Sequence, residues 1–139
     1  MTDKIAEVMT PRPLTISLDA PIVEAASAMR DADVGDVLVV RGKDLIGIVT
    51  DRDIAVRVVA GGRDPESTTV GEVSSGSVTA VSPDDDIDHA ISLMRDNALR
   101  RLPVVEAGQP VGIVSIGDLA VERDSTSALA DISAAPPNK

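Results

Sequence analysis

The sequence predicts an α/β (α+β) fold built from two pseudo-symmetric halves, and three observations support this prediction. The chain matches itself at an offset of 65 residues without a gap, so that each half carries the same pattern. Each copy alternates helical with strand-like hydrophobic periodicity. A length of 139 residues suffices for one sizeable core but not for two independent ones. We therefore expect the copies to pack face to face about a pseudo-twofold axis.

The repeat defines the expected domain boundaries. Coincident residues include Ile22 with Ile87, Met29 with Met94, Val39 with Val104, Gly47 with Gly112 and Asp53 with Asp118. The first repeat is expected over 1–63 and the second over 64–123. Residues 124–139 are small and polar with two adjacent prolines, so we expect a mostly disordered tail, in which Leu129 and Ile132 are weak candidates for docking on a surface.

Each copy opens with a short helix, an extended segment and a longer helix. These elements are expected at 5–9 and 70–73, at 14–16 and 78–81, and from 22 and 87 onward. The second short helix is preceded by Thr69, which has capping-box spacing to Glu72. The longer helices are indicated by apolar residues at i, i+3, i+4 and i+7 from Ile22 and from Ile87, which give each helix one apolar stripe.

A hairpin and a last helix complete each copy. The strands are expected at 37–40 and 45–49 and at 102–105 and 111–114, and the last helices at 51–59 and 116–123. Gly42 and Gly108 lie in the short segments between the strands, where hairpin turns favour glycine. The expected order in each copy is therefore helix, strand, helix, strand, strand, helix.

The composition excludes several classes of function. The chain has no cysteine, no aromatic residue and a single histidine, His89. Thiolate chemistry, multi-histidine metal sites and the aromatic platform for single-stranded nucleic acid are therefore ruled out. A net charge of −10 repels phosphate backbones and anionic membranes. Because neither a signal-peptide pattern nor a membrane-spanning apolar run is present, we expect a cytoplasmic protein without nucleic-acid or membrane partners.

The most informative segments lie where a predicted strand runs into a helix. Residues 47–53 and 112–118 both have a glycine, two aliphatic residues, a hydroxyl residue, two variable positions and an aspartate. The hydroxyl and aspartate pairs are Thr50 with Asp53 and Ser115 with Asp118. One interpretation is a capping box, which stabilises the helix start. The other is a binding site, in which the hydroxyl and the helix start bind a phosphate and the aspartate accepts hydrogen bonds from a ribose diol.

The doubled unit resembles a known family. The segments Gly47 to Ile54, Pro103 to Val105 and Gly112 to Ser115 are similar to those of a tandem pair of cystathionine-β-synthase (CBS) domains, also called a Bateman module. The resemblance covers about residues 5 to 123. It implies two β-α-β-β-α repeats packed through their sheets and two clefts that often bind AMP, ADP, ATP or another adenosyl compound. It also implies a stand-alone CBS-pair homodimer, with a target protein that remains unknown.

The resemblance implies roles for individual residues. Thr50 and Ser115 are expected to contact phosphate, and Asp53 and Asp118 to bind ribose. The full set of candidate nucleotide-binding residues is Thr50, Asp51, Arg52, Asp53, Ser115, Ile116 and Asp118 at the junctions, the aliphatic Ile16, Val37, Leu38, Val81, Leu102 and Pro103, and the basic Arg100 and Arg101. The two clefts are not equivalent, because the second copy has these arginines where the first has Gly35 and Asp36. The arginines are equally able to pair with the acids of 84–88.

Other chemistries find no support in the sequence. The acids of 84–88 fall at a helix start, where they complement the helix dipole, and they lack the spacing of a calcium-binding loop. His89 has no nucleophile partner, and Arg30 and Arg95 are expected to pair with neighbouring acids. We expect no enzyme, no metal and no required cofactor. The first hypothesis is a sensor of an adenosyl ligand that acts through its dimer, and the alternative is a structural or interaction protein that binds no nucleotide.

Overall fold

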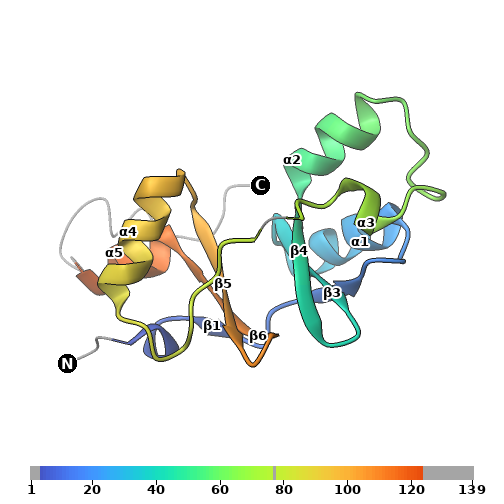
Figure 1. Ribbon diagram of the computed structural model, residues 1–139. Coiled ribbons are helices and arrows are strands. Elements are labelled where there is room, and N and C mark those ends of the chain that lie inside the picture. The colour runs from blue at the N-terminus through green and yellow to red at the C-terminus, as the bar shows by residue number, and fades with distance from the viewer. Residues whose placement is uncertain (1–3, 77, 124–139) are drawn as a thin grey trace. The chain divides into compact units, whose positions relative to one another are not determined.

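The chain forms two compact units in a computed structural model that describes residues 4–76 and 78–123 (Figure 1). The first-repeat unit contains residues 13–78 and 107–110. Within the described part of the chain, the second-repeat unit contains residues 4–12, 79–106 and 111–123. The segment that opens each sequence repeat thus belongs to the unit formed mainly by the other repeat. The predicted tail, 124–139, lies outside the described residues.

The first-repeat unit contains a mixed three-stranded sheet in the order β2-β3-β4. Its elements are β2 (Thr15–Ser17), α1 (Ile22–Ala32), β3 (Asp36–Arg41), β4 (Asp44–Thr50), α2 (Asp51–Asp53), η2 (Ile54–Val59) and α3 (Val70–Val73). Strand β3 runs parallel to β2 and antiparallel to β4, with Asp36 opposite Thr50. The helical segment that follows β4 changes from α to π geometry at Ile54. The predicted hairpin and both flanking helices are confirmed.

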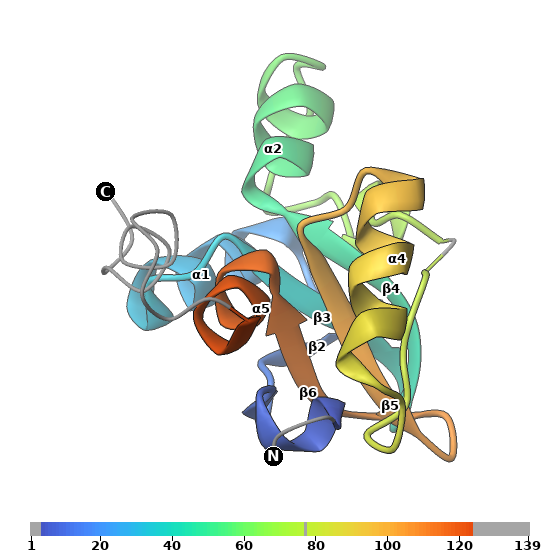
Figure 2. The same ribbon diagram turned by 90° about the vertical axis from the view of Figure 1, so that its left-hand side faces the viewer.

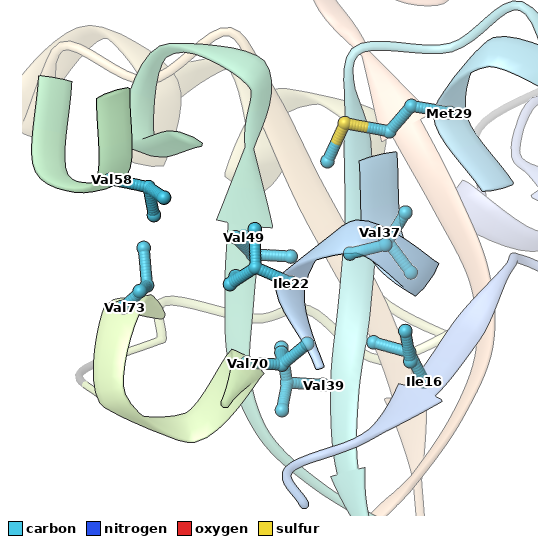
Figure 3. Close-up of a cluster of buried hydrophobic side chains, with 10 residues drawn as sticks. Ile16, Ile22, Met29, Val37, Val39, Val49, Val58, Val70 and Val73 are labelled. Carbon is cyan, nitrogen blue, oxygen red and sulfur yellow. The ribbon is translucent and has the colours of Figure 1, made fainter. Parts of the chain in front are cut away.

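An aliphatic core fills the first-repeat unit (Figure 3). It contains Ile16, Ile22, Ala25, Met29, Val37, Val39, Val49, Val58, Val70 and Val73. The predicted stripe of α1 faces this core. Val58 of η2 and Val73 of α3 point toward one another in Figure 3, and both are fully buried. Helix α3 belongs to the second sequence repeat, yet it completes the core of the first-repeat unit.

The second-repeat unit has the same plan. Its elements are η1 (Ile5–Glu7), β1 (Thr10–Pro11), α4 (Ile87–Asn97), β5 (Arg101–Glu106), most of β6 (Gln109–Ser115) and α5 (Ile116–Arg123). The sheet order is β1-β6-β5, and Figures 1 and 2 show α4 and α5 on the same face of the β5–β6 hairpin. Its core contains Ile5, Val81, Ile87, Ala90, Met94, Leu102, Val104, Val114 and Leu119. The prediction of a single shared core is therefore wrong, because each unit has its own buried cluster. Strand β1, which the sequence pattern did not indicate, pairs antiparallel with β6.

The strand predicted at 78–81 is wrong, because this segment is reduced to a single bridge between Val81 and Val104. In the first-repeat unit, the amide of Leu38 donates to the carbonyl oxygen of Leu14 at 3.0 Å and helps to join β2 to β3. Pro103 stands at the position equivalent to Leu38 and has no amide hydrogen to donate. The parallel ladder of the second-repeat unit is shorter for this reason.

The capping box predicted before α3 is confirmed, and it carries a consequence for pH dependence. Oε2 of Glu72 accepts hydrogen bonds from the amide of Thr69 at 2.7 Å and from its hydroxyl at 3.0 Å. The guanidinium of Arg63 donates to Oε1 at 3.1 Å. The bond from the Thr69 amide is the largest cause that holds the pKa of Glu72 below its ordinary value of 4.5.

A carboxylate whose pKa is lowered by folding stabilises the fold above its unfolded pKa and loses that contribution as the pH falls through the folded pKa. We therefore expect Glu72→Gln to be less stable than the wild type at neutral pH. This difference should shrink below about pH 4.5. Urea unfolding of both proteins at neutral and acidic pH measures it, and a difference that does not change with pH would contradict the assignment.

Candidate functional site

The first strand-to-helix junction is a closed capping box at the end of β4. The amide of Thr50 donates to Oδ2 of Asp53 at 2.9 Å, and the amide of Asp53 donates to Oγ1 of Thr50 at 3.1 Å. The amide of Asp51 donates to the carbonyl oxygen of Gly35 at 2.9 Å, which ties the helix start to the residue before β3. The capping interpretation of this motif is therefore confirmed.

The second junction repeats this geometry at the end of β6. The amide of Ser115 donates to Oδ2 of Asp118 at 2.9 Å, and the amide of Asp118 donates to Oγ of Ser115 at 3.1 Å. The amide of Ile116 donates to the carbonyl oxygen of Arg100 at 2.8 Å. Arg100 is offset from Gly35 by the repeat length, so the two junctions share their backbone bonds as well as their caps.

Capping leaves part of each junction available to a ligand. A hydroxyl that accepts one bond keeps its own hydrogen as a donor, and a carboxylate that caps through one oxygen keeps the other as an acceptor. For Asp53 that second oxygen is Oδ1, on a side chain that is 19% exposed. Asp118 is likewise partly buried. Each junction therefore offers a hydroxyl donor and a carboxylate acceptor beside the start of a helical segment.

The charges at the two junctions differ. The first has the exposed Asp51 and Arg52 at the start of α2, where Oδ1 of Asp51 accepts from the amide of Arg52 at 2.8 Å. A Cβ placed on Gly35 would lie 3.0 Å from Oδ2 of Asp51, so a side chain at the position where the second junction carries Arg100 would require Asp51 to shift. Arg100 and its neighbour Arg101 are exposed. The second junction is consequently the more basic one.

Sequence reasoning missed one charged residue at the first junction. Nε of Arg57 lies 3.9 Å from Oδ1 of Asp53, one turn along the same helical segment. The i, i+4 spacing of an acid and a base is a signal that could have identified this pair. The position equivalent to Arg57 in the second copy is Glu122, so the ion pair has no counterpart there by residue type.

The aliphatic candidates are buried rather than exposed. Ile16 and Val37 lie in the core of the first-repeat unit, and Val81 and Leu102 lie in the core of the second. Leu38 and Pro103 are also buried but belong to neither core cluster. Because successive strand residues face opposite sides of a sheet, Leu38 lies on the face away from Val37. Core packing explains four of them, Ile16, Val37, Val81 and Leu102, and contact of any of the six with a ligand stays a prediction.

An apolar cavity of about 280 Å³ opens between α4 and α5 in the second-repeat unit. It is lined by Ile91, Met94, Arg95, Leu99, Ile116, Leu119 and Ala120, and we call it the α4–α5 groove. Ile116, a candidate ligand-binding residue, is 54% exposed and belongs to this groove. No periodic signal marks the groove in the sequence, because its two walls come from helices that are far apart along the chain.

The remaining polar candidates are engaged in local contacts. Oδ2 of Asp85 accepts from the amide of Ser82 at 2.8 Å and lies 4.0 Å from Nε2 of the exposed His89. Asp86 precedes α4 and pairs with Lys4 at 3.1 Å. Among residues 4–76 and 78–123, no three His, Cys, Asp or Glu side chains are placed to hold a metal ion.

Two further expectations concern surfaces. Arg30 and Arg95 pair with Asp31 and Asp96 at 3.0 and 3.5 Å, so the predicted surface pairing is confirmed. None of the helices in the described part of the chain combines the length and apolar character needed to cross a bilayer.

Comparison with known proteins identifies the domain. The CBS domain family matches residues 5–60 and 70–124. The CBS domain-containing protein YhcV of Bacillus subtilis is 42% identical over 133 residues, which are 93% of this chain and 94% of YhcV. The match therefore extends over nearly the whole of both proteins.

Three solved structures share the fold of this chain. Hypoxic Response Protein I, solved with two coordinated zinc ions, is 29% identical, with a TM-score of 0.78 over 84% of this chain and 96% of that one. A hexameric CBS-CP12 protein from bloom-forming cyanobacteria is 28% identical, with a TM-score of 0.77 over 89% and 74%. The CBS domain pair of protein MJ0100, in complex with 5′-methylthioadenosine and S-adenosyl-L-methionine, is 24% identical, with a TM-score of 0.78 over 89% and 98%.

Proposed function

Because the chain belongs to the CBS domain family and carries two copies of the domain, we propose that it is a regulatory module that binds an adenosyl ligand and has no catalytic activity of its own. The observation that carries this proposal is the repeated junction. Each copy ends a strand in a hydroxyl residue and places an aspartate at the third position of the following helix, with matching hydrogen-bond distances. Capping alone accounts for one oxygen of each aspartate, and the second oxygen suits a ribose diol.

The two junctions favour different ligands. Arg100 and Arg101 at the second junction complement the phosphates of AMP, ADP or ATP. Asp36 and Asp51 at the first junction repel phosphate, and they favour an adenosyl compound with a neutral or cationic substituent, such as S-adenosylmethionine. Relatives with this fold hold adenosyl compounds in one case and zinc in another, so the choice of ligand depends on the residues of this chain.

Calorimetric titration of the purified, dialysed protein tests the proposal. AMP, ATP and S-adenosylmethionine are the probes, and 2′,3′-dideoxy-AMP is the matched control, because it keeps the base and phosphate but lacks the diol. We expect saturable binding of at least one probe and weaker binding of the dideoxy compound than of AMP. A bound probe at a hundredfold its dissociation constant should stabilise the fold by about 2.7 kcal/mol. Absence of binding by every probe would contradict the proposal.

The α4–α5 groove supports a second function, self-association of the chain. An open apolar groove on a small soluble protein commonly marks an interaction surface. The exposed Ile116 lines this groove together with Leu119 and Ala120. In a homodimer that covers this groove, the second subunit can respond to ligand binding in the first.

We expect Ile116→Asp to convert a dimer into a monomer, because a carboxylate in this groove would be buried without a partner. Val56→Asp is the matched control, since Val56 is 50% exposed on η2 and does not line the groove. Light scattering after gel filtration gives the mass of each protein. A monomeric wild type, or two variants that both stay dimeric, would contradict self-association through the groove.

A further inference from the structure

We propose that Arg57 couples ligand binding at Asp53 to the carboxyl end of α3. The guanidinium of Arg57 lies between two groups that differ in chemistry. Nε is 3.9 Å from Oδ1 of Asp53, and Nη1 donates a hydrogen bond to the carbonyl oxygen of Val73 at 3.1 Å. One planar cation thus contacts both the candidate ribose-binding carboxylate and the last residue of α3. The inference that a ligand acts on α3 through Arg57 rests on the proposed function. The inference that Arg57 connects Asp53 to α3 in the ligand-free protein does not.

The packing around Arg57 holds the guanidinium in this position. Its chain neighbour Val58 is fully buried and packs against Val73 in the core (Figure 3). Segment η2 and helix α3 are therefore held side by side, and the Arg57 side chain reaches the Val73 carbonyl through a partly buried hydrogen bond. Arg57 is 54% exposed, so the ion pair with Asp53 is screened by water and is weak enough to be broken by a competing donor.

The carboxyl end of α3 leads to the segment that leaves the unit. The amide of Ser74 donates to the carbonyl oxygen of Val70 at 2.9 Å. Ser75 then bridges to Ile48 of β4, with bonds of 3.0 and 3.4 Å in the two directions. The approach is close, because a Cβ on Gly47 would lie 2.7 Å from the carbonyl oxygen of Ser75. The chain leaves the first-repeat unit after residue 78, so a change at α3 reaches the connecting segment within a few residues.

A ribose diol and Arg57 use the same oxygen. A hydroxyl that donates to Oδ1 of Asp53 spreads the charge of the carboxylate and weakens its attraction for the guanidinium. The tie from Asp53 through Arg57 to Val73 is then loosened. Because such coupling is reciprocal, a loosened α3 also favours the ligand. By residue type the second copy has no such tie, because Glu122 stands at the position of Arg57 and a carboxylate cannot donate to a carbonyl oxygen.

The ligand-free test is a double-mutant cycle read by amide hydrogen exchange. Asp53→Asn removes the charge but keeps an oxygen that can cap the helix. We expect it to speed exchange at the amides of Ser74 and Ser75 by about twofold to fivefold, the range for a partly exposed ion pair. In an Arg57→Met background the same change should have no further effect. Arg30→Met is the matched control, because Arg30 pairs on the surface of the same unit with Asp31.

The ligand-bound test repeats the measurement with S-adenosylmethionine, the probe that the charges of the first junction favour. Binding should speed exchange at Ser74 and Ser75 in the wild type and in Arg30→Met, and should leave these amides unchanged in Arg57→Met while binding persists. The inference is overturned if Asp53→Asn acts equally in both backgrounds, or if the ligand alters these amides without Arg57. If S-adenosylmethionine does not bind, the ligand-dependent part of the inference fails, and the ligand-free cycle still decides whether Arg57 connects Asp53 to α3.

Discussion

Truncating Ile22 or Ile87 to alanine is expected to lower the free energy of unfolding by about 2–5 kcal/mol in each case. The two residues are equivalent in the repeat, and each is fully buried at the start of a long helix in its own core. Removing three carbon atoms leaves a cavity that packed aliphatic neighbours cannot fill. Urea unfolding followed by circular dichroism measures the loss.

Val23→Ala provides the control for this prediction. Val23 lies next to Ile22 on α1 but is 39% exposed. Its truncation should change stability by no more than about 0.5 kcal/mol. Equal losses for Val23→Ala and Ile22→Ala would show that the assigned face of α1 is not the buried one. A small loss for only one of the two isoleucines would show that the units do not have equivalent cores.

Replacing Asp53 or Asp118 by alanine is expected to weaken ligand binding at the affected junction by about tenfold to a hundredfold, because a carboxylate that accepts from a diol makes charge-assisted hydrogen bonds. Each change also removes half of a capping box, at a cost of about 1 kcal/mol in stability. Calorimetric titration gives the affinity, and urea unfolding gives the stability of the same variants.

Glu72→Gln separates the effect on ligand affinity from the effect on stability. Glu72 caps α3 through Thr69 in the same way, but it belongs to neither junction. Its replacement should alter stability while leaving affinity unchanged. If Asp53→Ala and Asp118→Ala also lose stability without losing affinity, the two aspartates serve only as helix caps.

The helices, hairpins and helix caps could be predicted from the sequence because local patterns determine them. The apolar stripe from Ile22 and the hydroxyl-to-aspartate spacing at Thr50 each lie within one or two turns of helix, and the structure confirms both. The spacing also predicted the second junction, since Ser115 repeats Thr50. What a local pattern cannot supply is the partner of each element.

Three features depended on such partners. Helix α3 packs into the first-repeat unit, a choice made by the contacts of Val70 and Val73 rather than by their own sequence pattern. The shortened ladder at Val81 could have been predicted from Pro103, but only with the register of the neighbouring strand in hand. The tie from Arg57 to Val73 joins residues sixteen apart, across a loop whose path the sequence does not indicate.

The central claim is that the two strand-to-helix junctions are the ligand sites, and amide chemical-shift mapping of the isotope-labelled protein tests it most directly. Titration with AMP and with S-adenosylmethionine should move the amides of 50–53, of 115–118, or of both, with the phosphate-bearing ligand acting at 115–118. Shifts confined to the α4–α5 groove residues Ile91, Leu99 and Ala120, or no shift with either ligand, would contradict the claim.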